Sequence, residues 1–368
     1  MDFFSFIKGI FGSTDWGNNQ QNINMSETKY DEYVPNPYKP FIRVTDRIKT
    51  AFSSKYGLYP HEILMLHYAP TTLVGQKKFY GFWLYDYGVE YPSKLIESLI
   101  DRGFLQQGSI ADTIANLKLS ELKSLLKQNG LPITGNKPEL LKRVMNRLPL
   151  DQLASKYTHR YYALTDLGKA ALTDGEYVPY FHTSKVVPYT GFDIWFLNQL
   201  LHENPGISYH QCIIQYLEKM AGDYKKQRHF GLYRCYLLSL HDVYVTMNNW
   251  YAALDKLTEV FFWDLSGMEE DQDYKELNRS NYKSSQKSIL SIYQWYNNAL
   301  IGYIRKLQKH LGMTDNQLRE YLTSKFTSLR SEFHLLLPSE CVDFVFACIS
   351  KDDNAIRNIN DSAMRRLK

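Results

Sequence analysis

The sequence lacks paired cysteines and long apolar runs. Its 368 residues include only four cysteines, Cys212, Cys235, Cys341 and Cys348, and no two of them form a Cys-x-x-Cys pair. All four lie among apolar and aromatic neighbours, as buried thiols usually do, which favours a reducing cytoplasm as the location of the protein. No stretch approaches the length of about 20 apolar residues that a membrane-spanning helix requires, so we expect no membrane span.

Motifs that mark common active sites and cofactor sites are also missing. The chain contains no GxxxxGK[ST], GxGxxG or GxSxG sequence. The stretch HEILMLH does not match HExxH, because His67 follows His61 by six positions. We therefore expect no catalytic residue, no cofactor, no metal site and no enzymatic activity. A nuclease site assembled from carboxylates that are distant in the sequence is the alternative that these motifs leave open.

The chain does contain enough apolar material for two or three folded domains. Hydrophobic residues make up 44% of it and aromatic residues 15%, a composition that can bury a core. The net charge of +4 is mild, and spread evenly it would identify no partner. The distribution of charge along the chain is therefore more informative than its sum.

Residues 1–40 form the first predicted segment, an amphipathic helix followed by a polar linker. The opening MDFFSFIKGIFG places its large apolar side chains on one stripe of a helix. The residues after it are rich in Asn and Gln and end in a cluster of prolines, which is typical of a linker. The apolar stripe favours docking on a protein, and a membrane surface is the alternative.

Residues 41–180 are predicted to form one small domain. The segments PHEILMLHYA and YPSKLIESLIDRGF predict helices, KKFYGFWLYDYG predicts an aromatic helix or turn, and FLQQG and RYYAL predict two strands. These segments resemble the helices and wing strands of bacterial winged-helix proteins, which implies a winged-helix-like domain from a bacterial or phage-like source. Residues 106–159, between the two strands, are far longer than an ordinary wing turn of a few residues. We therefore expect a second module inserted in the wing.

The third helix of this domain gives no clear signal for DNA reading. Its outward positions hold Lys94, Glu97, Ser98, Asp101 and Arg102, whose charges nearly cancel. A helix that reads the major groove usually has a basic face. The sequence leaves open whether this helix reads bases or is a scaffold that presents the inserted module.

The inserted module, predicted at residues 112–148, has the pattern of a helical hairpin. Apolar residues recur at helical spacing in two stretches, which an extended turn at residues 131–136 separates. Ser120 is the expected N-cap of the first helix, Gly130 ends it, and Pro138 begins the second helix. The predicted inward positions are Leu122, Leu125, Leu126, Leu140, Leu141, Val144 and Leu148.

This hairpin resembles the SAP motif, a helix-extended-helix DNA-binding module with the pattern LxLxxLKxxLxxxGLxxxGxKxxLxxR. The resemblance covers about a tenth of the chain and implies binding to DNA, in its double-stranded form. The matching positions are Leu117, Leu119, Leu122, Lys123, Leu126, Gly130, Leu131, Gly135, Lys137, Leu140 and Arg143.

Positive charge is concentrated in the same stretch. Residues 117–148 contain seven basic side chains and only two acidic ones, as expected of a phosphate-binding module. Gly135 and Asn136 lead into the second helix, whose N-terminal N–H groups and dipole favour an anion. Lys137 adds a full charge there, and Gly135 would let the backbone approach a ligand closely. The predicted DNA-binding residues are Lys118, Lys123, Lys127, Thr134, Gly135, Asn136, Lys137, Lys142 and Arg143.

Residues 186–368 are predicted to form an all-helical C-terminal domain. Apolar residues recur at helical spacing over residues 191–204, 208–226, 229–265, 285–311, 314–330 and 338–350. The aromatic side chains are more numerous than one layer of short helices easily buries, so we expect some of them to form an interface, most simply that of a two-fold homodimer. The aromatic residues concerned are Trp195, Phe196, Tyr233, Tyr236, Trp250, Phe261, Phe262 and Trp263.

The sequence therefore predicts a mainly α protein: a winged-helix-like domain with an inserted SAP-like helical hairpin, followed by an all-α C-terminal domain. The predicted function is that of a cytoplasmic, non-enzymatic DNA-binding protein. Two alternatives remain: a protein-interaction adaptor built on the C-terminal domain, and a DNA-processing factor with an active site that no motif marks.

Overall fold

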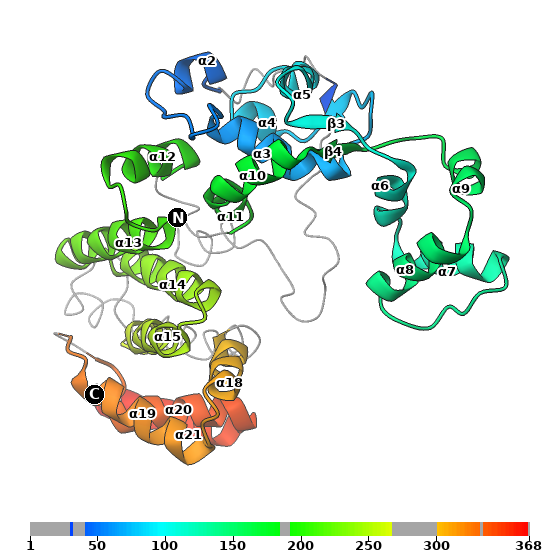
Figure 1. Ribbon diagram of the computed structural model, residues 1–368. Helices are drawn as coiled ribbons and strands as arrows, with labels where there is room; N and C mark the ends of the chain where they lie inside the picture. Colours follow the sequence, from blue (N-terminus) through cyan, green and yellow to red (C-terminus); the bar gives the residue numbers. More distant parts are fainter. Residues whose placement is uncertain (1–29, 32–40, 185–191, 267–299, 332–333, 367–368) are drawn as a thin grey trace. The chain divides into compact units, whose positions relative to one another are not determined.

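The computed structural model describes residues 30–31, 41–184, 192–266, 300–331 and 334–366. The chain is mainly helical, as the sequence predicts, and the strands among these residues are short (Figure 1). No helix within these ranges is long and apolar enough to cross a membrane. The amphipathic helix predicted in residues 1–12 lies outside the described residues. The N-terminal unit comprises the described residues of Ser26–Ser184 and Gly191–Pro205, and the C-terminal unit those of Gly206–Lys368.

The N-terminal unit contains short helices and two antiparallel strand pairs. Its elements in chain order are β1 (Tyr30–Asp31), α2 (Val44–Arg47), α3 (Pro60–Tyr68), η1 (Ala69–Thr71), β2 (Lys78–Phe79), α4 (Phe82–Tyr85), α5 (Pro92–Asp101), β3 (Leu105–Gln107), α6 (Ile110–Ala115), α7 (Leu119–Gln128), α8 (Lys137–Arg147), α9 (Leu150–Lys156), β4 (Tyr162–Leu164), α10 (Asp166–Asp174), α11 (Tyr177–Thr183) and α12 (Ile194–Glu203).

The central helix of this unit is α3. Pro60 suits its first turn, where a missing N–H costs nothing, and the Glu62 carboxylate accepts a hydrogen bond from the Tyr59 N–H at 2.8 Å. Every residue from Pro60 to Leu66 is buried, because α5, α10, α11 and α12 all pack against this helix. A helix that is apolar on nearly all sides requires such a surrounding.

The two strands predicted around the insertion are confirmed. β3 pairs antiparallel with β4, and Leu105 lies opposite Leu164. An isolated bridge between Leu73 and Tyr161 places the segment after η1 on the other edge of β4. The chain therefore runs from helix α3 through this edge segment, two further helices and β3, and returns as β4 after the insertion.

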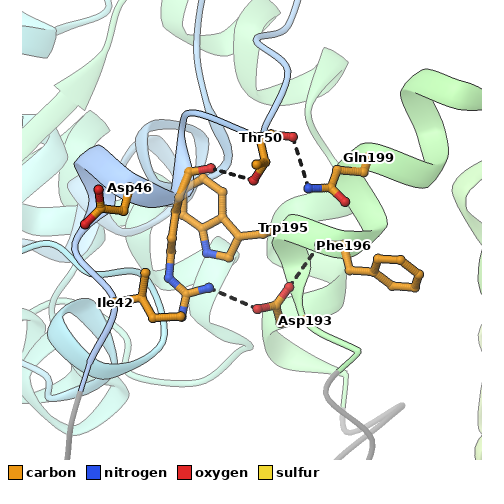
Figure 2. Close-up of a pocket in the computed structure, with 8 residues that line it drawn as sticks. Ile42, Asp46, Thr50, Asp193, Trp195, Phe196 and Gln199 are labelled. Carbon is orange, nitrogen blue, oxygen red and sulfur yellow. Dashed lines mark hydrogen bonds and ion pairs between the residues drawn. The ribbon is translucent and has the colours of Figure 1, made fainter.

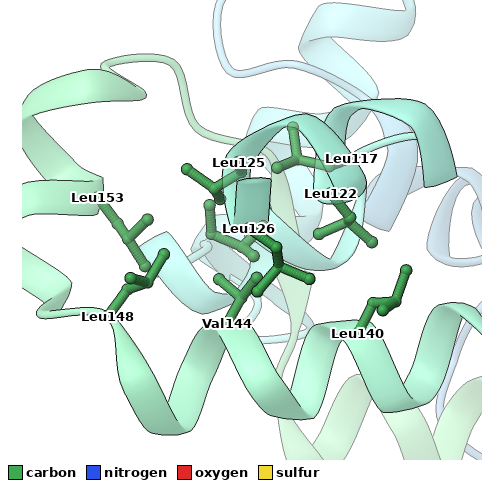
Figure 3. Close-up of a cluster of buried hydrophobic side chains, with 9 residues drawn as sticks. Leu117, Leu122, Leu125, Leu126, Leu140, Val144, Leu148 and Leu153 are labelled. Carbon is green, nitrogen blue, oxygen red and sulfur yellow. The ribbon is translucent and has the colours of Figure 1, made fainter. Parts of the chain in front are cut away.

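The insertion between β3 and β4 contains the four helices α6 to α9, which surround an aliphatic core of their own (Figure 3). This core extends beyond the predicted limits of residues 112–148, because Leu153 of α9 contributes to it. Six of the seven predicted inward positions are buried, and Leu141 is half-buried against the cluster. The core residues are Ile114, Leu117, Leu122, Leu125, Leu126, Leu140, Val144, Leu148 and Leu153.

Helix α12 belongs to the N-terminal unit, although the sequence analysis places residues after 186 in the C-terminal domain. The Asn198 side chain accepts from the Phe52 N–H at 2.7 Å and donates to the Phe52 carbonyl at 2.9 Å. The His202 ring stacks on the Phe52 ring with centroids 3.5 Å apart. These contacts involve the polar face of α12, whereas the prediction used only its apolar periodicity.

The described part of the C-terminal unit is helical. Its elements are α13 (Tyr209–Lys226), α14 (Phe230–Thr246), α15 (Trp250–Asp264), α18 (Leu300–His310), α19 (Asp315–Ser328), α20 (Pro338–Ser350) and α21 (Asp353–Arg366). Residues 229–265 hold two helices, because the chain turns at Asn248, which has a left-handed φ of 57°. Helices α13, α14 and α15 pack in sequence as antiparallel neighbours joined by short turns. The part of residues 285–311 before Leu300 lies outside the described residues.

Candidate nucleic-acid interface

The hairpin of α7 and α8 is built on leucine packing between the two helices. Leu122 and Leu126 of α7 and Leu140 and Val144 of α8 are all 0% exposed (Figure 3). Helix α7 begins at Leu119, so the prediction that Ser120 is its N-cap is wrong. The Glu121 carboxylate instead accepts a hydrogen bond from the Lys118 N–H at 2.6 Å, which satisfies a donor before the first turn.

The turn between the two helices is fixed at both ends. Gly130 has a φ of 65° and ends α7, and the Leu131 N–H donates to the Leu126 carbonyl at 2.9 Å. This is the pattern of a glycine C-cap, as predicted. Arg143 reaches back from α8 and donates to the carbonyls of Pro132 and Thr134. The Arg143 guanidinium therefore holds the extended turn against α8.

The N-terminus of α8 is closed by a capping box. The Asn136 side chain accepts from the Glu139 N–H at 3.1 Å, and the Glu139 carboxylate accepts from the Asn136 N–H at 3.1 Å. The capping box uses the N–H groups of Asn136 and Glu139, and Pro138 has no N–H. Among residues 136–139, the Lys137 N–H is therefore the one backbone donor outside the capping box. A phosphate approaching Lys137 would therefore meet the Glu139 carboxylate at the same helix end.

The backbone conformation and the close packing at position 135 favour glycine there, in addition to the predicted approach of a ligand. Its φ is +123°, which L side chains rarely adopt. A Cβ atom at this position would lie 2.3 Å from Glu139 Oε2. The glycine thus makes room for the carboxylate that caps α8.

The basic side chains of the hairpin lie on its outer surface. Lys123 and Lys127 are one turn apart on α7 and share one flank of that helix. Residues Thr134, Gly135 and Asn136 of the turn are exposed. The exposed basic residues are Lys118, Lys127, Lys142 and Arg147, and the half-buried ones are Lys123, Lys137 and Arg143.

The hydrogen bonds divide the predicted site into two parts. Arg143 is bonded to the carbonyls of the turn, and Asn136 is bonded to Glu139 at the start of α8. Among the described residues of the hairpin, no hydrogen bond or ion pair extends this network to the side chains of Lys123, Lys127 or Lys142. The α7 lysines therefore form a separate basic face, and any common role requires a ligand that reaches both.

The positive charge of the hairpin is not compensated by ion pairs among the residues that the structure describes. Its seven basic and two acidic side chains give +5 over residues 117–148, against +4 for the entire chain. In the part of the chain that the structure describes, none of the seven forms an ion pair. Both acidic side chains, Glu121 and Glu139, are occupied by capping bonds to backbone N–H groups. Burial, and then the charge of Glu121, raises the pKa of Tyr157, which packs against the hairpin core.

Two helices joined by an extended turn, with a leucine core and a basic outer surface, define the helix-extended-helix class of nucleic-acid-binding modules. Residues 113–149 match the family model of the SAP domain, which confirms the predicted resemblance. The chain therefore contains a SAP domain, and this domain indicates nucleic-acid binding in general. No curated protein and no solved structure matches the chain.

A pocket of about 240 Å³ lies between α2 and α12 of the N-terminal unit (Figure 2). Its polar groups bond mainly to one another. Arg47 donates to the Asp193 carboxylate at 3.0 Å, and the Gln199 amide donates to the Thr50 carbonyl at 3.0 Å. These bonds hold α12 on the segment after α2, so the pocket belongs to the packing of the unit.

The buried His61 and the half-buried His182 of the N-terminal unit contribute to packing. Burial, and then the charge of Arg102, lowers the pKa of His61 to about 3. His182 lies between the hydroxyls of Tyr68 and Tyr87, and burial lowers its pKa to about 4. Both rings are therefore neutral at physiological pH. No group of three or more His, Cys, Asp or Glu side chains suited to a metal ion occurs among the described residues.

Proposed function

We propose that this protein is a non-enzymatic DNA-binding protein that contacts the phosphate backbone of double-stranded DNA through its SAP domain. The observation that carries the proposal is a set of seven basic side chains on a hairpin of 32 residues, none of which forms an ion pair with another described residue. Lysine and arginine side chains that stay unpaired in the protein release counterions when they neutralise phosphates, which drives association. The proposed DNA-binding residues remain those predicted from the sequence.

The winged-helix-like part is proposed as a scaffold rather than a reader of bases. The order of α3, the edge segment at Leu73, α4, α5, β3 and β4 supports the winged-helix assignment. However, Arg102, which directly follows α5, is ion-paired with the buried Glu62 and donates to the Gly57 carbonyl at 3.0 Å. Arg102 thus stabilises the fold, and the outer face of α5 keeps Lys94 beside the acidic Glu97. Major-groove reading favours a more basic face.

Removal of two exposed charges from the SAP domain tests this function. In Lys127→Gln/Lys142→Gln, both positions lie outside the apolar core, so the fold should persist. Binding to a duplex should weaken, and the slope of log affinity against log salt should fall by about two. The matched control is Lys306→Gln/Lys309→Gln on α18, which removes the same charge from exposed positions of the C-terminal unit.

The parent, the variant and the control are compared by fluorescence anisotropy across salt concentrations. Equal slopes for all three would contradict the proposed interface. Absence of binding by the parent would contradict the proposed function. Incubation of the same duplex with magnesium or manganese addresses the enzymatic alternative, because cleavage would contradict the non-enzymatic assignment.

The C-terminal unit supports a second role, contact with a protein partner or with a second copy of the chain. The structure weakens the original argument for a dimer, because six of the eight aromatic residues named for it are buried within the chain. At the turn between α14 and α15, Met247 is 38% exposed and Tyr251 is 57% exposed. We propose self-association through this turn, where apolar anchors are available. A strictly monomeric species in light scattering at tens of micromolar would contradict it.

A further inference from the structure

The insertion that contains the SAP domain is hydrogen-bonded on both its entry and its exit side to one segment of the N-terminal unit, residues 70–74. On the entry side, the Asn116 side-chain amide donates to the Pro70 carbonyl at 2.7 Å. On the exit side, the Val74 N–H donates to the Arg160 carbonyl at 2.9 Å. The insertion that contains the SAP domain is therefore attached at two points, in contrast to a module tethered by flexible linkers.

Helix α6 links the core of the SAP domain to the backbone near β4. One of its side chains packs into that core, and the side chain before it bonds to the chain that returns to β4. Ile114 is part of the aliphatic core of the SAP domain. Thr113 is 0% exposed, and its hydroxyl donates to the His159 carbonyl at 3.3 Å, where the chain returns toward β4. Just before α6, a Cβ atom at Gly108 would lie 2.7 Å from the Tyr161 carbonyl oxygen. The entering and leaving backbones are thus in close contact.

The segment that holds the SAP domain continues into a short basic loop. Gly75 turns the chain with a φ of 78°, Lys77 follows in the loop, and Lys78 begins β2; both lysines are exposed. Only a few residues separate these lysines from Pro70 and Val74, to which the SAP domain is bonded. The attachment point and this basic loop therefore belong to the same piece of backbone.

We propose that the SAP domain and the loop of Lys77 form one nucleic-acid-binding surface of fixed geometry, on which the loop contacts phosphates of the same DNA molecule that the SAP domain binds. The proposal rests on the DNA-binding function proposed above. Two contact regions whose relative orientation is fixed before binding lose less freedom on association than two flexibly linked ones. The proposed partner is a nucleic-acid backbone, because both regions offer positive charge.

The fixed attachment can be tested without any ligand. In the full chain, ¹⁵N relaxation should give amides of α7 and α8 the same rotational correlation time as amides of α3 and α10. In Asn116→Ala, which removes the bond to Pro70, the amides of α6 should lose protection from hydrogen exchange first. A clearly shorter correlation time for α7 and α8 in the parent would overturn the attachment.

The contribution of the loop is tested with matched lysine substitutions. Lys77→Ala should weaken binding to a duplex by about three- to fivefold and lower the salt slope by about one. Lys94→Ala removes the same charge from the exposed face of α5 and should leave both quantities unchanged. Equal effects of the two substitutions, or no effect of Lys77→Ala, would overturn the shared surface.

The two failures are distinguishable. If the parent binds no duplex at any salt concentration, the DNA-binding function and the shared surface both fail, while the relaxation measurement still decides on the attachment. If the parent binds and Lys127→Gln/Lys142→Gln weakens binding but Lys77→Ala does not, the SAP interface stands and the inference about the loop is wrong.

Discussion

The SAP domain and the C-terminal unit differ in how many of their basic side chains form ion pairs. In the SAP domain the seven basic side chains of residues 117–148 form no ion pair among the described residues. In the C-terminal unit basic side chains repeatedly meet carboxylates, both at the surface and in the interior. The pairs are Arg234–Asp264, Lys325–Asp255, Arg305–Asp315, Arg319–Asp343 and Arg366–Glu340.

The paired basic side chains of the C-terminal unit are neutralised within the fold, whereas the proposed function assigns those of the SAP domain to a nucleic-acid partner. Exposed ion pairs contribute only about 0–1 kcal/mol each, so pairing alone does little for stability. Like charges collected on a small surface repel one another and slightly destabilise the folded state. The SAP domain has this repulsion, and no ion pair with another described residue offsets it. A polyanion would remove the repulsion on binding, which agrees with the proposed function.

The two regions also differ in their cores, and the largest expected effect lies there. The nine core residues of the insertion that contains the SAP domain are all aliphatic, whereas the C-terminal unit also buries Phe261, Phe326 and Phe344. Leu126→Ala should cost about 3 kcal/mol through lost burial and a residual cavity. For a small core this is a large share of the stability, so the SAP domain should open locally.

Hydrogen exchange measured by mass spectrometry checks this first prediction. Residues 113–149 should lose protection in Leu126→Ala, while helices α13 to α15 keep theirs. The matched control is Leu257→Ala in α15, which removes an equally buried leucine and should leave the SAP domain protected. Loss of protection throughout the chain in Leu126→Ala would show that the SAP domain does not unfold separately.

The second-largest expected effect is on duplex affinity, when a basic side chain of the SAP domain is replaced by an acidic one. Lys137→Glu should weaken duplex binding by about tenfold at moderate salt, because it removes a cation and adds an anion at the start of α8. The fold should survive, since Lys137 lies outside the apolar core. Lys309→Glu on α18 makes the same change on an exposed surface of the C-terminal unit and should have little effect. Anisotropy titrations measure both, and equal weakening would mean that overall charge governs binding.

Much of the SAP domain could be predicted from its sequence because its helices are regular. Leucine spacing identified both α7 and α8 and their buried faces, and Gly130 marked the end of α7. The flanking α6 and α9 were missed as parts of the core, because six or seven residues give too few turns for a periodic pattern. The capping role of Glu139 was readable in the sequence, since Glu three residues after Asn136 is a capping-box pattern.

Other features depend on contacts that no local pattern contains. Arg143 was predicted to bind DNA as one of several cations, and the structure shows it also holding the carbonyls of Pro132 and Thr134. Helix α12 is predicted from the sequence as part of the C-terminal domain, but it belongs to the N-terminal unit. The bonds of Asn198 to Phe52 that hold it there join residues distant in the sequence, so no local pattern reveals them. Periodicity reports which face of a helix is buried, and it does not report the partner.

A smaller effect compares how helices end in the two regions. Helix α7 ends at Gly130 with a φ of 65°, whereas α20 ends at Lys351 with a φ of 58°. The left-handed conformation costs L residues roughly 1 kcal/mol relative to glycine. Gly130→Ala should therefore destabilise the SAP domain by about 1 kcal/mol, and Lys351→Gly should stabilise the C-terminal unit by up to about that amount. Hydrogen exchange in each region measures both, and changes of the same sign would contradict the argument.

The smallest effect decides whether a phosphate approaches the N-terminus of α8. Glu139→Gln keeps an oxygen that can accept from the Asn136 N–H and removes the negative charge beside Lys137. If a phosphate binds there, duplex affinity should rise by about threefold, because one repulsive charge is lost. Glu121→Gln makes the same change in the bond that caps α7, where the Lys118 side chain is a proposed DNA contact, and should raise affinity less, since no backbone anion site is proposed at that helix end. Equal gains measured by anisotropy would assign the effect to general electrostatics, and the exposed lysines of α7 would then be the principal phosphate contacts.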